Sequence, residues 1–174
     1  EIMTTERYFS QNPLLIPQAK PNSGVPEDLY SSDIIELKRA IKRYQKEFLE
    51  MVLGVELYNE YITDMADEVL KLKWDAFNSK LWDSENLISP VANYIYYKFL
   101  GDNAVLLTGR TFTVQSVENQ TVIPTVKMQV RAWNEMCKMN RIFFTWLTEA
   151  EIETIAELDC SAWDYLCSYK NSYL

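Results

Sequence analysis

The fold is decided by SPVANYIYYKFLG (residues 89–101) together with VKMQVRAWNEMCKMNRIFFTWL (residues 126–147). Ser89 is a favoured N-cap residue, and Pro90 takes the first helical position, where its missing N–H costs nothing. The first stretch therefore predicts a helix that begins at Pro90. Apolar residues cover nearly its whole circumference, so we expect it to be buried, either within its own domain or against another subunit.

The second stretch predicts a long amphipathic helix. Its apolar residues recur at steps of three and four, the spacing of one helix face: Val126, Val130, Trp133, Cys137, Phe144 and Leu147. A polar stripe accompanies them, formed by Lys127, Arg131, Glu135 and Lys138. Arg131 and Glu135 are four residues apart, a spacing that allows an ion pair within the helix.

The segment between the two stretches has the composition of short strands. Thr111, Phe112, Thr113 and Val114 are strand-forming residues, and residues 116–120 are polar. We therefore predict a β-hairpin arm at about residues 109–123. The predicted fold class is mainly α: a helical bundle with a short β-hairpin arm between two long helices and an extended, Pro-rich N-terminal arm.

The N-terminal arm is assigned to residues 1–30. Four prolines, Pro13, Pro17, Pro21 and Pro26, prevent a long helix there and favour extended chain. An apolar patch within it, Leu14, Leu15 and Ile16, is expected to pack on a neighbouring subunit or on the parent domain. The alternative for this arm is disorder. Because the chain begins at Glu1 and not at Met, we expect an omitted or disordered leader.

Residues 31–147 form the predicted helical domain. A helix capped by Ser31 or Ser32 is expected to end at Gly54, because glycine is the favoured residue just after a helix C-terminus. Two more helices are predicted over residues 55–62 and 64–77, the second with Met65, Val69, Leu72, Trp74 and Phe77 as its apolar side. Residues 148–174 should open with a capping box, Thr148 and Glu151, and end in a partly helical aromatic tail.

Composition limits the partners. The net charge of −8 and the absence of basic runs argue against binding nucleic acid through its phosphates. No apolar run is long enough to span a membrane, and residues 1–10 lack the pattern of a signal peptide. The three cysteines, Cys137, Cys160 and Cys167, have no metal-binding spacing and are expected to be small buried hydrophobes in a reducing cytoplasm.

No catalytic pattern is present in the sequence. The chain contains no histidine, which removes the nucleophilic and metal schemes that depend on it, and it has no phosphate-binding glycine loop. Asp64, Asp67 and Glu68 lie close enough on a helix to suggest a cation site, but a solvated helix face explains them as well. We predict a protein that is not an enzyme and that has no cofactor or metal. Paired-carboxylate chemistry is the remaining enzymatic alternative.

The order of several segments resembles a known family. These segments are residues 44–58, Lys73-Trp74, residues 90–100, Asp102-Asn103, Thr108-Gly109 and residues 130–136. Together they resemble small head-to-tail connector (adaptor, neck ring) proteins of tailed bacteriophages with Bacteroides-type hosts, including crAss-like phages. The resemblance covers roughly residues 34–141 and departs at the arm, where Arg110 follows Gly109 in place of a further glycine.

The resemblance implies a structural virion protein at the neck, or portal vertex, assembled in the host cytoplasm. It implies a ring homo-oligomer, dodecameric by analogy, that docks on the portal protein, contacts other neck or tail proteins and bridges capsid to tail. DNA would be passing cargo only, and no membrane would be involved. The alternative is a non-enzymatic helical protein-binding module or another tail or head-completion protein.

In either case contacts carry the function. We expect Tyr94, Tyr97 and Trp133 to pack the central helices, and Arg110, Phe112 and Val114 in the arm to contact a partner. With 5 Trp, 11 Tyr and 7 Phe, aromatic side chains are abundant, and we expect subunit interfaces to use many of them. An aromatic-rich core is the alternative. Ring assembly predicts exposed apolar patches on the isolated subunit, whereas a binding module predicts few.

Overall fold

The computed structural model describes residues 3–16, 32–104, 125–149 and 160–171. Within these ranges the protein is mainly helical, as predicted: α1 (Ser32–Met65), α2 (Asp75–Leu81), α3 (Pro90–Ala104), α4 (Thr125–Glu149) and α5 (Trp163–Cys167). Short 3-10 helices lie at η1 (Glu6–Phe9), η4 (Leu70–Trp74) and η6 (Cys160–Ala162). These ranges contain no strand, and the β-hairpin predicted for residues 109–123 lies outside them.

Helix α3 begins where the sequence predicts. The side-chain Oγ of Ser89 accepts a hydrogen bond from the backbone N–H of Ala92 at 3.2 Å, and Pro90 is the first helical residue. Buried side chains cover most of its circumference: Val91, Ala92, Tyr94, Ile95, Tyr96, Phe99 and Leu100. Helix α3 therefore packs within its own domain, which decides between the two environments that its sequence allowed.

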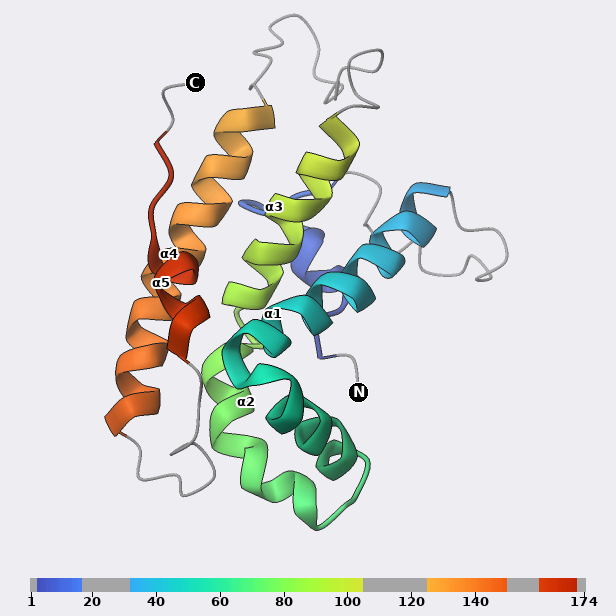
Figure 1. Ribbon diagram of the computed structural model, residues 1–174. Helices are drawn as coiled ribbons and strands as arrows, with labels where there is room; N and C mark the ends of the chain where they lie inside the picture. The colour runs from blue at the N-terminus through green and yellow to red at the C-terminus, as the bar shows by residue number, and fades with distance from the viewer. Residues whose placement is uncertain (1–2, 17–31, 105–124, 150–159, 172–174) are drawn as a thin grey trace, which may run out of the picture.

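Helix α4 runs antiparallel to α3, and the two lie side by side through the body of the molecule (Figure 1). Trp133 of α4 is fully buried between them, with its ring centroid 6.3 Å from that of Tyr94 and 4.7 Å from that of Tyr97. The predicted amphipathic face of α4 is buried from Trp133 to Leu147, but Val126 at its N-terminal end is exposed. The predicted pairing of Arg131 with Glu135 is not formed, because the Glu135 carboxylate bonds Lys138 at 2.6 Å.

Helix α1 changes direction at Gly54. This residue has φ 74° and ψ 164°, a backbone conformation that only glycine adopts readily, and residues 55–65 then resume helical geometry. The part of α1 before Gly54 buries its predicted apolar face, including Leu37, Tyr44 and Phe48, against the core. The sequence thus locates the interruption correctly. The part of α1 after Gly54 covers residues 55–65 and is longer than the predicted 55–62.

The predicted helix over residues 64–77 is wrong in its first half. Asp67 Oδ1 accepts hydrogen bonds from the backbone N–H groups of Val69 at 2.8 Å and Leu70 at 3.0 Å, which ends the helix in a turn. Because the chain leaves the helical period there, Val69 and Leu72 do not join the apolar face. They are 73% and 61% exposed, while Trp74 and Phe77 of η4 and α2 are buried.

The N-terminal segment, residues 3–16, is part of the core and not a free extended arm. Phe9, Leu14 and Ile16 are buried, and the Ile16 N–H donates to the Phe9 carbonyl at 2.8 Å. Thr4 joins distant parts of the chain: its N–H donates to Gln45 Oε1 at 2.9 Å, and its Oγ1 accepts from Trp82 Nε1 at 2.9 Å. Residues 17–30 of the predicted arm lie outside the described ranges.

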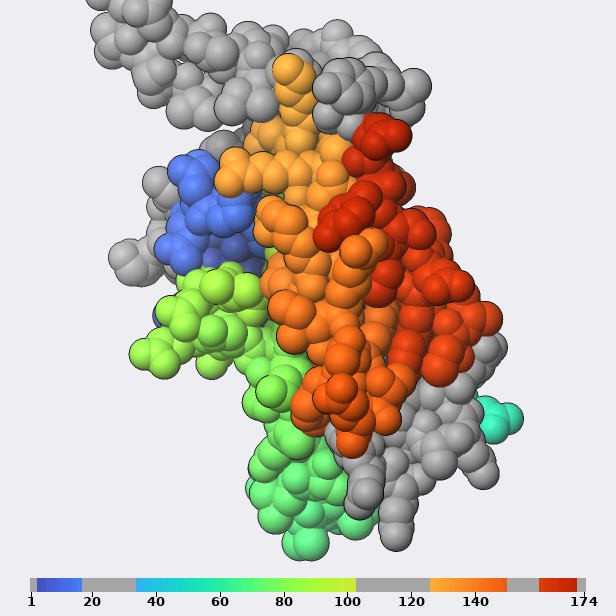
Figure 2. Space-filling view, turned by 90° about the vertical axis from the view of Figure 1, so that its left-hand side faces the viewer, coloured from blue at the N-terminus to red at the C-terminus, as the bar shows by residue number. Residues whose placement is uncertain are grey.

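The C-terminal part returns to α1 and α4, and it is partly helical, as predicted. Trp163 stacks on Phe144 with ring centroids 4.3 Å apart, and its Nε1 donates to the Val52 carbonyl at 3.2 Å. Figure 2 shows the N-terminal segment (blue) and the C-terminal segment (red) on opposite sides of α4 (orange). The capping box predicted at Thr148 is not seen: Thr148 lies in the last turn of α4, and Glu151 is outside the described residues.

Most aromatic side chains are in this single core. Among the described residues, Trp74, Trp82, Trp133 and Trp163 are all buried, and so are Phe9, Phe48, Phe77, Phe99, Phe143 and Phe144. The expectation that aromatics gather at subunit interfaces is therefore wrong for these residues. The three cysteines are free thiols, and the prediction that all three are buried holds only for Cys137, because Cys167 is half-buried and Cys160 is exposed. Within the described ranges, no helix has the length and apolar character needed to cross a membrane.

Candidate functional site

The structure places the predicted central residues in the core. Tyr94 and Trp133 are buried, and Tyr97 is half-buried at the edge of the α3–α4 pair. The Tyr94 hydroxyl donates to Glu47 Oε1 at 2.6 Å, and Lys98 bonds the same oxygen at 3.0 Å. Burial, reinforced by the bond to Glu47, raises the pKa of Tyr94. These residues fix the central helices and leave little surface for a partner.

Glu47 is held ionised at this position. Burial alone would raise its pKa, but the hydrogen bonds from Tyr94 and Lys98 outweigh it and hold the pKa of Glu47 below its usual range. Beside it, the Tyr44 hydroxyl donates to an Asp102 carboxylate oxygen, and burial followed by this bond raises the pKa of Tyr44 to about 12. The cluster joins α1 to α3 by paired polar groups. A pocket of about 250 Å³ opens beside Tyr44 and Asp102.

The C-terminal segment is bound along α4 by Trp133 and Tyr97, which the sequence singled out, and by Asn140, which it did not. Trp133 Nε1 donates to the Ser168 carbonyl at 2.7 Å, and Asn140 Nδ2 donates to the Leu166 carbonyl at 3.0 Å. The Lys170 ammonium lies 4.2 Å from the ring centroid of Tyr97 and 4.0 Å from that of Trp133. An asparagine on an apolar helix face was the sequence signal for such a contact, because a buried amide requires hydrogen-bond partners.

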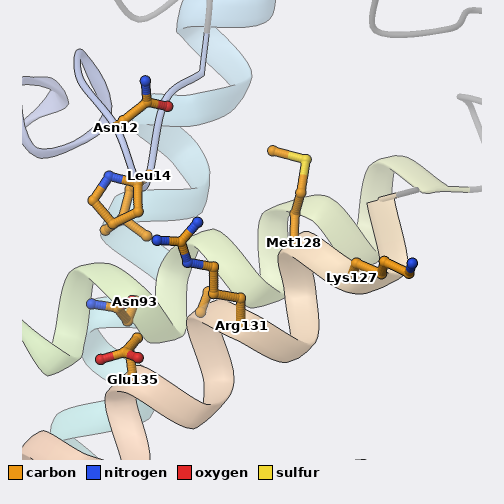
Figure 3. A pocket seen from close by; sticks show the side chains of 9 residues that line it. Asn12, Leu14, Asn93, Lys127, Met128, Arg131 and Glu135 are labelled. Atoms are coloured by element: carbon orange, nitrogen blue, oxygen red, sulfur yellow. The ribbon is translucent and has the colours of Figure 1, made fainter. Parts of the chain in front are cut away.

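A groove lies between the N-terminal segment and the central helices (Figure 3). It has a volume of about 560 Å³, and its apolar wall comes from Pro13, Leu14, Met128 and Ala132. Its polar lining comes from Asn12, Asn93, Lys127, Arg131 and Glu135. Because Leu14 forms one wall, the apolar patch of the N-terminal segment contributes to this surface although Leu14 itself is buried.

The remaining residues predicted to make contacts fall into two groups. Leu14 and Ile16 pack on the parent domain, and Leu15 is half-buried, with its carbonyl 3.4 Å from the hydroxyl of Tyr96. The sequence allowed the patch of residues 14–16 to pack either on a neighbouring subunit or on the parent domain. The structure shows it on the parent domain. Arg110, Phe112 and Val114 lie outside the described residues.

An apolar tip lies at the end of the molecule opposite the C-terminus of α3 and the N-terminus of α4. It consists of Val69, Leu70 and Leu72, which are 73%, 47% and 61% exposed in the turn and the 3-10 helix between α1 and α2. In Figure 1 this tip lies at the bottom, away from the ends of α3 and α4 that enclose residues 105–124. Glu68 and Lys71 pair at its margin. Exposed apolar residues with a charged margin are typical of protein–protein contacts.

The acidic residues near this tip have structural partners. Asp64 accepts from Lys73 and from Trp74 Nε1, and these bonds, led by Lys73, lower the pKa of Asp64. Asp67 caps the turn, and Glu68 pairs with Lys71. No group of residues that could hold a metal ion occurs in the described part of the chain. The cation-site hypothesis for these three acids therefore has no support from the geometry.

Comparison of the chain with protein-family models, with curated proteins and with solved structures finds no match.

Proposed function

We propose that this protein is a structural virion subunit, a head-to-tail connector that docks on the portal protein and bridges capsid to tail. The sequence resemblance over residues 34–141 supports the proposal. The structural observation that carries it is the apolar tip, where Val69, Leu70 and Leu72 are exposed together. A subunit that assembles into a larger particle keeps such a surface for its partner.

The energetics of the tip favour assembly. Burying a valine or leucine side chain contributes about 1.5–3 kcal/mol, so three of them at one contact offset part of the entropy lost on association. A closed ring needs two different complementary patches on each subunit. The tip is one candidate patch, and the groove of Figure 3, which lies on another part of the surface, is a second.

The β-hairpin arm belongs to this proposal. The C-terminal end of α3 and the N-terminal end of α4 lie at one end of the molecule, opposite the tip (Figure 1). An arm with Arg110, Phe112 and Val114 would reach a partner from that end while the tip contacts a neighbour from the other. The ring would be dodecameric by family analogy, with DNA as passing cargo and the portal vertex as its location.

The mass of the purified protein in solution, measured by light scattering, tests this function. We expect a monomer that joins a much larger complex when mixed with the portal protein of the same phage. A tip variant, Val69→Ser with Leu72→Ser, should remain folded and fail to join. Ile142→Ser is the matched control, because Ile142 is 74% exposed on α4 and distant in sequence from the tip.

Deletion of residues 116–120 tests the arm in the same assay. The shortened chain should keep its helical circular dichroism and lose docking. Unchanged docking would contradict the role of the arm. A wild-type monomer that ignores the portal and the other virion proteins would overturn the connector proposal.

The second candidate is a helical binding module with a single partner. One observation favours it: most aromatic side chains of the described residues form one core, and only Tyr165 and Tyr169 of these residues are exposed. A module would bind its partner one to one and would not form a ring. Light scattering separates the two candidates, because only the connector changes mass by many subunits.

A further inference from the structure

We propose that the groove between residues 12–14 and helices α3 and α4 binds an extended acidic peptide segment of a partner protein. The ligand has three chemical requirements: an apolar side chain, a backbone N–H donor and a carboxylate. Each follows from a different part of the groove lining. A connector subunit and a binding module could use this site alike.

The shape of the groove favours a peptide over a small molecule. Its volume of about 560 Å³ is sufficient for a few residues of peptide. Asn12, Pro13, Lys127 and Arg131 on its rim are exposed, so the groove is open to solvent along one side. A chain can therefore lie in it and continue in both directions, whereas a small ligand would stay largely solvated.

The acceptor is Asn93, at the base of the groove (Figure 3). This residue is 5% exposed, and its Nδ2 donates to the Ser89 carbonyl at 3.0 Å, which fixes the orientation of the amide. Its Oδ1 is buried and accepts no hydrogen bond from the described residues. A buried amide oxygen without a donor is costly, so a ligand N–H that reaches it, by displacing the side chains that cover it, is favoured at this point.

The charge of the groove selects an acidic ligand. Arg131 and Lys127 follow each other by one helical turn on α4, both are exposed, and neither forms an ion pair with a described residue. Glu135 also lines the groove, but its carboxylate is paired with Lys138. The charge left for a ligand is therefore positive, in a protein of net charge −8. A guanidinium binds a carboxylate through two parallel hydrogen bonds.

The apolar wall supplies the third requirement. Leu14, Met128 and Ala132 line the groove, and in Figure 3 Met128 stands on α4 between Arg131, which lies beside Asn93, and Lys127 at the far end. Methionine adapts its shape to different apolar side chains. The predicted motif is therefore an apolar residue with an Asp or Glu within a few positions of it, in extended conformation.

Selection from a random dodecapeptide library on the folded full chain tests the proposal. We expect enriched peptides to share an apolar residue and a nearby acid. Their affinity, measured by fluorescence polarisation, should fall about tenfold or more with Arg131→Glu, because the charge-assisted bonds are lost and replaced by repulsion. Arg39→Glu is the matched control: it changes the net charge equally on an exposed part of α1 that does not line the groove, and it should bind normally.

The donor is tested on the ligand, which leaves the protein unchanged. Methylating each backbone nitrogen of the best peptide in turn should reveal one position where binding falls about tenfold. That sensitivity should disappear in Asn93→Ala. The proposal is overturned if no peptide is enriched, if the consensus lacks an acid, or if Arg131→Glu and Arg39→Glu bind equally well.

Discussion

Asn134 holds the backbone of Lys170 by two hydrogen bonds. Its Nδ2 donates to the Lys170 carbonyl at 3.0 Å, and its Oδ1 accepts from the Lys170 N–H at 2.9 Å. One side-chain amide thus satisfies both backbone groups of a residue 36 positions away. Together with the bonds from Trp133 and Asn140, this pairing makes residues 166–170 part of the α4 surface.

Replacing this amide tests how much the pairing contributes. We expect Asn134→Ala to lower the free energy of unfolding by about 1–3 kcal/mol, because two backbone groups lose their partners. Urea unfolding gives the change, and hydrogen exchange at Lys170 should accelerate. Thr145→Ala is the control, since the Thr145 hydroxyl donates to the Arg141 carbonyl of its own helix and does not reach the C-terminal segment. Equal effects of the two substitutions would contradict a tethering role for Asn134.

Gly54 allows a second prediction. Its φ of 74° with ψ of 164° is a region that other residues enter at a cost of about 1–3 kcal/mol. A Cβ at Gly54 would meet no atom within 4 Å, so it would cause no clash. We therefore expect Gly54→Ala to lower the free energy of unfolding by about 1–3 kcal/mol, through backbone strain alone.

Gly101→Ala is the contrasting variant. Gly101 lies inside α3, and a Cβ there would meet only the flexible end of Gln129, at 3.1 Å. Alanine is the better helix former by about 1 kcal/mol, so this change should be close to neutral or stabilising. Thermal unfolding of both variants measures the difference. A neutral Gly54→Ala would mean that the bend in α1 tolerates straightening.

Local signals made part of this fold predictable. Ser89 and Pro90 specify a helix start through their own side chain and ring, and Gly54 specifies an interruption through its missing Cβ. In each case the cause lies within a few residues, so the printed sequence contains it. The apolar period of α4 is equally local, and it locates Trp133 on the buried face before any neighbour is known.

Other features depend on distant partners. The prolines of the N-terminal segment restrict its backbone, but they do not say what Leu14 contacts. That segment is placed by bonds such as Trp82 to Thr4, across 78 positions. Val69 is exposed because the Asp67 carboxylate accepts hydrogen bonds from two backbone N–H groups and so forms a turn. This turn competes with the helix that the apolar spacing alone favours. The groove exists only after these segments meet, so no sequence pattern could indicate it.

The N-terminal segment gives a third prediction. If residues 3–16 belong to the core, Leu14→Ala should lower the free energy of unfolding by about 2–5 kcal/mol, because Leu14 is 4% exposed. Leu15→Ala should cost clearly less, since Leu15 is only half-buried. Chemical denaturation of the two variants provides the comparison. Similar small losses for both would show that the segment detaches in solution and does not stabilise the domain.

Buried tyrosines predict a loss of stability in alkali. Burial raises the pKa of Tyr96 to about 12, and burial with the bond to Asp102 raises that of Tyr44 to about 12, against an ordinary value of 10.0. The folded state therefore retains the hydroxyl protons of Tyr44 and Tyr96, and that of Tyr94, which the unfolded chain releases near pH 10. Their contribution is complete below that pH and is lost progressively as the pH rises toward 12.

Urea unfolding at several pH values measures this loss, and tyrosinate absorbance reports the ionisation directly. Tyr96→Phe should change the stability little at pH 8, because the Tyr96 hydroxyl lies 3.4 Å from its nearest acceptor, the Leu15 carbonyl. It should lessen the loss between pH 10 and pH 12, since one proton-releasing group of the unfolded chain is gone. If the variant and the wild type lose stability in parallel, Tyr96 ionises alike in both states and is not shielded by the N-terminal segment.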